Sequence, residues 1–97
     1  LVEAERVLRA SVGRDKEQPF AWYQLGMIYD RKGDLPRAAL ATAERYSLQG
    51  EPKLALASAE RAMRGIPAGT PDHIRAQDIA MVSRDQVERD KKNRRNR

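Results

Sequence analysis

The fold is decided by residues 22–29, which read Trp22-Tyr23-Gln24-Leu25-Gly26-Met27-Ile28-Tyr29. Large apolar side chains recur in this stretch at the three- and four-residue spacing of one helix face, with a glycine among them. Gly33-Asp34-Leu35 and then Ala38 follow it. Gly26 and Ala38 have almost no side chain, so two consecutive helices can cross closely at this point. The large residues of the stretch fill the space on either side of the crossing.

Helical periodicity extends outward over the rest of the chain, and no segment shows the alternation of a strand. Prolines stand where helices can begin, and glycines stand where they can end. The pattern predicts helices over residues 1–13, from Pro19 to Gly33, over 35–49, from Pro52 to Gly65, and over 71–90. Thr70 is expected to cap the last of them. Nothing apolar follows Val87, so residues 91–97 are predicted to form a basic, disordered tail.

The spacing of the helix ends indicates a repeat. Gly33 and Gly50 each follow a tyrosine by four residues, and they lie 17 residues apart. Seventeen residues make one helix and a tight turn, and twice that length is the 34-residue period of two-helix repeats. The alternative is an unrelated five-helix bundle whose glycines coincide by chance. The spacing favours an all-α helical repeat array.

The stretch 22–29 resembles the tetratricopeptide repeat (TPR), in which the first helix reads W-x-x-L-G-x-x-Y and the second carries a small alanine where Ala38 stands. Thr42 and Arg45 depart from this register, since the family has an aromatic residue and an alanine there. A second register, counted from Pro36, restores the pattern. The residues at repeat positions in the two registers are Trp22, Leu25, Gly26, Tyr29, Gly33, Ala38, Ala43, Tyr46, Gly50, Ala55, Ala62 and Pro67.

The resemblance implies one TPR-like domain over residues 1–90, with a right-handed array of about five helices. Residues 1–13 would be the second helix of a partial repeat, and residues 19–67 two overlapping repeats. Residues 71–90 would form a C-terminal capping helix. The helix over 35–49 would belong to both repeats, and its many alanines suit packing on two sides.

A narrower resemblance concerns the order of three segments, Leu40 to Gly50, Ile66 to Pro71 and Arg75 to Ile79. This order is similar to the C-terminal TPR region of bacterial envelope zinc metalloproteases of the beta-barrel-assembly-enhancing type. The chain begins mid-pattern without a methionine, so we expect a fragment of such a protease. The resemblance implies a bacterial periplasmic or envelope location, and a cytoplasmic one if it fails. It also implies that zinc and the H-E-x-x-H motif belong to a parent domain outside this chain.

In TPR arrays the side of the first helix opposite the core lines a concave groove that receives extended peptides. That side carries the predicted partner-binding residues, which are Phe20, Tyr23, Gln24, Met27 and Arg31, with Arg37 on the next helix. Alternatively, Phe20 and Met27 pack on a preceding repeat. Tyr23 and Met27 occupy places where some TPR proteins carry a carboxylate clamp, which argues against a receptor for chaperone tails. The expected partner is a protein or peptide, such as outer-membrane assembly components or the parent protease domain.

Catalytic chemistry finds no support in the sequence, and we expect no enzyme, metal or cofactor in this chain. There is no cysteine, and the only histidine, His73, is expected on the surface. The serines have no histidine at motif spacing. Glutamates such as Glu44 and Glu60 lie on arginine-rich helix faces, which favours solvated ion pairs. No apolar run approaches the roughly 20 residues of a membrane helix.

The net charge of +5 lies mainly at the C-terminal end. Residues 84–97 hold seven basic and three acidic side chains, which is +4, and the preceding residues are close to neutral. Clustered arginine and lysine can neutralise phosphates, but no aromatic residue is interleaved for base stacking. A solvated terminus is the favoured interpretation, and nucleic acid is not the expected partner. A free-standing adaptor that uses its tail on nucleic acid or membranes stays the alternative function.

Overall fold

The structure, a computed structural model, describes residues 2–14 and 18–95. Within these residues the protein is all helical. The five helices are α1 (Val2–Arg14), α2 (Pro19–Arg31), α3 (Leu35–Leu48), α4 (Pro52–Gly65) and α5 (Pro71–Arg95). The expectation of an all-α helical array is confirmed for this part of the chain. None of these helices is both long enough and apolar enough to cross a membrane.

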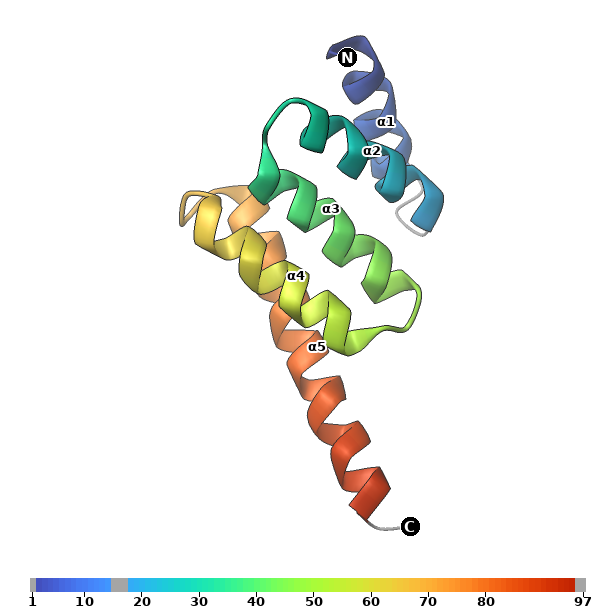
Figure 1. Cartoon of the computed structure of the whole chain (residues 1–97), viewed down its shortest axis with the longest axis vertical. Helices are drawn as coiled ribbons and strands as arrows, with labels where there is room; N and C mark the ends of the chain where they lie inside the picture. The colour runs from blue at the N-terminus through green and yellow to red at the C-terminus, as the bar shows by residue number, and fades with distance from the viewer. Residues whose placement is uncertain (1, 15–17, 96–97) are drawn as a thin grey trace.

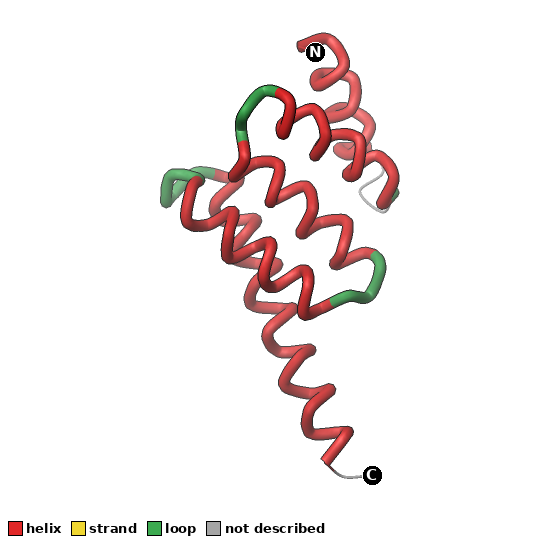
Figure 2. The backbone as a smooth tube through the Cα atoms, viewed as in Figure 1, coloured by secondary structure: helices red, strands yellow, loops and turns green. Residues whose placement is uncertain are grey.

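Helices α2, α3 and α4 lie side by side, and each runs antiparallel to the next (Figure 1). Short loops join them (Figure 2). Among the described residues, α5 packs on both α3 and α4, whereas α1 packs on α2 alone and α2 makes no contact with α4. The molecule measures 50 × 26 × 20 Å, and its long axis includes the projecting end of α5 (Figure 1).

Local signals account for the helix boundaries. Gly33 and Gly50 have φ of 78° and 71°, a left-handed conformation that favours glycine and ends α2 and α3. The Asp34 carboxylate accepts a hydrogen bond from the backbone N–H of Arg37 at 3.2 Å and so caps α3. The hydroxyl of Thr70 accepts from the backbone N–H of His73 at 3.3 Å, which is the cap predicted for α5.

The main core lies between α3, α4 and α5 and consists mostly of alanine. Ala43, Ala55, Ala59, Ala62 and Ala76 are completely buried. Larger side chains such as Leu40, Ile66 and Ile79 complete this cluster. Small residues on three helices allow the backbones to approach closely, so the three helices pack as one unit.

A smaller core lies on α2 and is contacted by α1 and by Ala38 of α3. Ala21, Leu25 and Tyr29 are buried in it, and Leu8 and Trp22 pack against them while partly exposed. Trp22, one of the large residues expected to fill the space beside the helix crossing, is half-buried at the edge of this cluster. The N-terminal pair is therefore held by a few large side chains.

Two glycines permit close helix packing. A Cβ atom at Gly26 would lie 3.5 Å from the Cβ of Ala41 and 3.7 Å from the carbonyl oxygen of Ala38, which is ordinary van der Waals contact. A Cβ atom at Gly65 would lie only 2.3 Å from the Cγ of Pro36. Helix α4 ends at Gly65 as predicted, but without a positive φ, and the glycine also lets α4 touch the start of α3.

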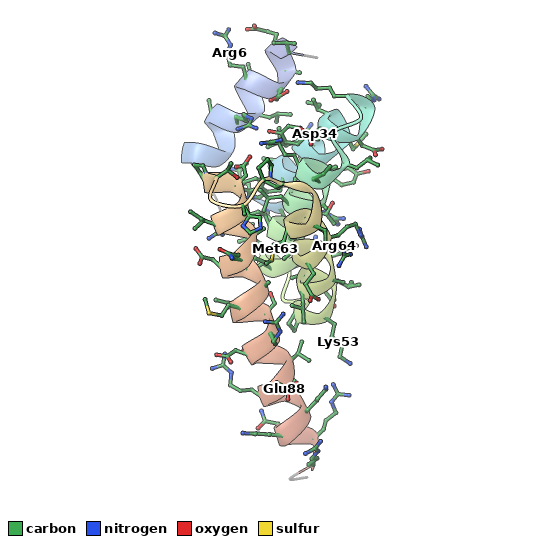
Figure 3. The ribbon with its side chains drawn as sticks, turned by 90° about the vertical axis from the view of Figure 1, so that its left-hand side faces the viewer. Arg6, Asp34, Lys53, Met63, Arg64 and Glu88 are labelled. Carbon is green, nitrogen blue, oxygen red and sulfur yellow. The ribbon has the colours of Figure 1, made fainter. Side chains whose placement is uncertain are left out.

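The C-terminal helix is longer than expected. Helix α5 continues to Arg95, so the prediction of disorder is wrong for residues 91–95, while residues 96 and 97 lie outside the described residues. Its end projects beyond the other helices, where Glu88 is labelled in Figure 3. Lys91 pairs with Glu88 at 3.5 Å, and basic residues in the last turn interact favourably with the helix dipole. The ion pair and the favourable interaction with the helix dipole are consistent with a helix that continues here without burying side chains.

Candidate protein-binding groove

An open groove of about 430 Å³ lies between α2 and α3, with one residue from α4 at its edge. Its lining residues are Tyr23, Gly26, Met27, Asp30, Leu35, Ala38, Ala39, Thr42, Arg45 and Arg61. The floor is formed by the small residues at the α2–α3 crossing. Larger apolar side chains stand along the walls, which suits the burial of apolar groups from a bound chain.

The α2 wall of the groove is apolar and aromatic. The ring centroids of Phe20 and Tyr23 lie 6.4 Å apart in a stacked arrangement. Phe20, Tyr23 and Met27 are 67%, 46% and 42% exposed, and Leu35, across the groove on α3, is 61% exposed. Neighbouring exposed apolar side chains of this kind mark interaction surfaces more often than isolated ones do.

Arg45 connects the two walls of the groove. Its guanidinium carbon lies 5.3 Å from the ring centroid of Tyr23 on α2 and 4.6 Å from that of Tyr46 on α3. Its Nε atom is buried and has no hydrogen-bond partner among the described residues. Arg45 therefore makes cation–π contacts with one aromatic ring on each of the two helices.

The structure brings together only part of the predicted partner-binding set. Tyr23 and Met27 line the groove, and Phe20 stacks beside them. Gln24 and Arg31 are exposed on α2 but do not line the groove. Arg37 does not line it either, because its side chain turns to a different hollow of the molecule.

That second hollow, of about 260 Å³, lies between α1, α2, α3 and α5. It is lined by Arg9, Trp22, Leu25, Tyr29, Arg37, Leu40, Ala41, Glu44, Asp72 and Arg75. Arg37 donates from Nε to Asp72 at 2.9 Å and from a terminal nitrogen to Asp34 at 3.3 Å. The bond to Asp72 raises the pKa of Arg37. Arg37 therefore lies apart from Tyr23, with its guanidinium held by two aspartates, and its role in partner binding stays a prediction.

The other arginines of this second hollow are paired as well. Arg75 forms a two-fold bond to Glu44, at 2.8 and 2.6 Å, and this bond raises the pKa of Arg75. Glu44 is only 6% exposed, so it is not the solvated carboxylate that was expected. Arg9 pairs with Glu5 at 3.2 Å and lies over the ring of Tyr29. Burial raises the pKa of the Tyr29 hydroxyl.

Sequence reasoning missed Leu35, Arg45 and Arg61 as lining residues of the groove. A signal existed for Arg45, since a charged residue replaced the usual alanine of the repeat. No comparable signal pointed to Arg61. It lies on α4, and its approach to the α2–α3 groove depends on the angles between three helices.

His73 is buried, not on the surface as expected. It is 9% exposed, and its Nδ1 atom has no hydrogen-bond partner among the described residues. It borders a shallow hollow together with Glu60, Met63, Arg64 and Arg84. In the part of the chain that the structure describes, no group of three histidine, cysteine or acidic residues could hold a metal ion.

Comparison of the chain with protein-family models, with curated proteins and with solved structures found no match in any of the three. The functional argument therefore rests on the groove itself and on the residues that carry the TPR resemblance.

Proposed function

We propose that this chain is a non-catalytic protein-interaction module of the TPR kind, which binds an extended polypeptide in the groove between α2 and α3. The observation that carries the proposal is the exposed apolar wall of Phe20, Tyr23 and Met27 beside a floor of small residues. A polypeptide lying there buries apolar side chains on this wall. The groove is short, so affinity for a single peptide is expected to be weak.

We further propose that the chain is the substrate- or partner-binding C-terminal region of a bacterial envelope zinc metalloprotease. The support is the order of segments from Leu40 to Ile79 described above. In this proposal the parent domain supplies zinc and hydrolysis. The TPR module contacts substrates, outer-membrane assembly components or the protease domain itself. An H-E-x-x-H motif upstream in the same gene product is the expected finding, and its absence would contradict the attachment to a protease.

The groove is tested by an interaction assay between the full-length parent and its envelope partners. The variant Tyr23→Ala plus Met27→Ala removes the wall, while Arg94→Ala plus Arg95→Ala changes only the projecting end of α5. We expect binding to be lost in the first variant and retained in the second. Loss of binding only in the second variant, or proteolysis by the isolated chain, would contradict the proposal.

A second candidate is an adaptor that contacts anionic surfaces through the end of α5. Its support is that residues 89–95 form a projecting helix with five exposed basic side chains. The single acid of this segment, Asp90, turns toward the α3–α4 turn, where it borders a hollow with Ser47 and Glu51. Binding to anionic vesicles or duplex DNA that weakens with salt and disappears in Arg94→Ala plus Arg95→Ala would support this candidate.

A further inference from the structure

The arginines that line the groove and those that line the second hollow differ in their partners. On the side of the second hollow, Arg9, Arg37 and Arg75 each pair with a carboxylate. In the groove, Arg45 and Arg61 form no ion pair with any described residue. Among the described residues, Asp30 is the only acid that lines the groove. The groove therefore carries uncompensated positive charge.

Arg45 is held in a way that prepares it for an anion. Its guanidinium carbon lies 5.3 Å from the ring centroid of Tyr23 and 4.6 Å from that of Tyr46, so two aromatic contacts restrict the side chain. Its buried Nε–H lacks an acceptor among the described residues, although buried donors in proteins are almost always paired. An incoming carboxylate can accept from a planar guanidinium fork with little loss of side-chain freedom, because the fork is already oriented.

We propose that the groove takes an acidic polypeptide segment, whose apolar side chains pack on Tyr23, Met27 and Leu35 and whose carboxylate is received by Arg45 and Arg61. This inference rests on the proposed function, because it names the chemistry of the chain that the groove binds. An extended polypeptide fits better than a small anion, since the walls beside the two arginines are apolar along α2 and α3. Adjacent side chains of such a segment alternate in direction, so apolar and acidic groups can reach different parts of the groove.

The test uses three fluorescein-labelled peptides that alternate leucine with serine and carry two central glutamates, glutamines or lysines. Their dissociation constants for this chain are measured by fluorescence anisotropy at neutral pH and at two salt concentrations. We expect the glutamate peptide to bind roughly tenfold or more tightly than the glutamine peptide, since hydrogen bonds to charged groups are the stronger ones. The lysine peptide is expected to bind most weakly.

Arg61→Gln and Arg64→Gln form a matched pair, because both remove one exposed cation from α4 but only Arg61 lines the groove. Arg61→Gln should reduce the preference for glutamate over glutamine by roughly threefold to tenfold, and Arg64→Gln should leave it unchanged. Arg45→Gln should remove most of the preference. Its melting curve is compared with that of the parent, because the substitution also removes two ring contacts.

The possible results separate the inference from the proposed function. If glutamate and glutamine peptides bind equally and Tyr23→Ala plus Met27→Ala weakens both, the groove binds polypeptide and the acidic preference is wrong. Equal effects of Arg61→Gln and Arg64→Gln would overturn the inference in favour of a general attraction to net charge. Failure of all three peptides to bind, or binding that survives the loss of Tyr23 and Met27, would contradict the groove function itself.

Discussion

The α3–α5 unit and the α1–α2 pair are built on different principles. In the α3–α5 unit, fully buried alanines let three helices pack against one another, and α5 covers the seam between α3 and α4. In the α1–α2 pair, Leu8 and Trp22 pack at the edge of a small cluster, and an ion pair between Lys32 and Glu5 joins the end of α2 to α1. No described helix packs on both α2 and α3 in the way that α5 packs on α3 and α4.

This difference explains the location of the groove. The surface between α2 and α3 exposes small residues, Gly26 and Ala38, and no further helix in the described part of the chain covers them. The α3–α5 unit supplies Leu35, Arg45 and Arg61, and α2 supplies the aromatic wall. A bound segment would occupy the position of a third helix on this seam, so binding is expected to stabilise α2 against α3.

The largest effect on stability is expected at one of the few large side chains in the core of the α3–α5 unit. Ile79 is 4% exposed between α5 and the alanine cluster, and Ile79→Ala should lower the free energy of unfolding by about 2–5 kcal/mol. Close backbones limit the collapse of the resulting cavity. Urea denaturation followed by circular dichroism measures the loss.

Val82→Ala is the control for this substitution, because Val82 lies on the same helix and is 64% exposed. Its effect should stay within about 0.5 kcal/mol. Similar losses for the two variants would mean that α5 does not pack on α3 and α4 through the face that contains Ile79.

The second prediction compares two glycines. Gly65→Ala should destabilise the protein by about 1–3 kcal/mol, because its Cβ would overlap the ring of Pro36 within the α3–α5 unit. Gly26→Ala places its Cβ at 3.5 Å from Ala41, and it should be neutral or stabilising by up to about 1 kcal/mol through helix propensity. Thermal melting of both variants measures their stabilities relative to the parent chain. The reverse order of stabilities would contradict the packing described for α4 on α3.

These glycines also show what sequence reasoning could find. The ends of α2 and α3 were predictable, because Gly33 and Gly50 act on the backbone next to them. The role of Gly65 was not, since it depends on Pro36 from another helix. The length of α5 was underestimated because we took the burial of apolar side chains as necessary for a helix. Its last turns instead carry charged residues that interact with one another and with the helix dipole.

The same distinction applies to the groove. Tyr23 and Met27 were predictable because they share the side of α2 opposite Leu25, a matter of helix periodicity. The pairing of Arg37 was not predictable, because Asp72 lies 35 residues away on a helix whose direction the sequence does not specify. Long-range ion pairs of this kind are determined by packing and leave no local pattern.

The third prediction concerns pH and the α1–α2 pair. The hydrogen bond from Lys32, at the end of α2, holds the pKa of Glu5 on α1 below its ordinary value, and Arg9 contributes to the same effect. The stabilisation is therefore complete above the ordinary carboxyl pKa of about 4.3 and is lost as the pH falls through the lowered value. Because the pair is partly exposed, the loss should be about 0.2–1 kcal/mol.

Fluorescence of Trp22, the only tryptophan, reports on this part of the molecule during acid titration. Glu5→Gln should remove the acid-dependent change, while Glu3→Gln should keep it, because Glu3 pairs only with Arg6 within α1. An unchanged titration in Glu5→Gln would show that another carboxylate controls the contact between α1 and α2.

The smallest effect on stability is expected at the opposite end of the chain, where α5 projects beyond both units (Figure 1). Residues 91–95 are exposed and helical, so they bury nothing against α3 or α4. Deletion of residues 91–97 should therefore change the free energy of unfolding by less than about 0.5 kcal/mol. It should nevertheless reduce the circular dichroism signal at low temperature by the contribution of the last helical turns.

A lower melting temperature after this deletion would mean that the end of α5 contacts the body of the protein. An unchanged helical signal would mean that the helix stops near residue 90, as the loss of apolar residues after Val87 first suggested.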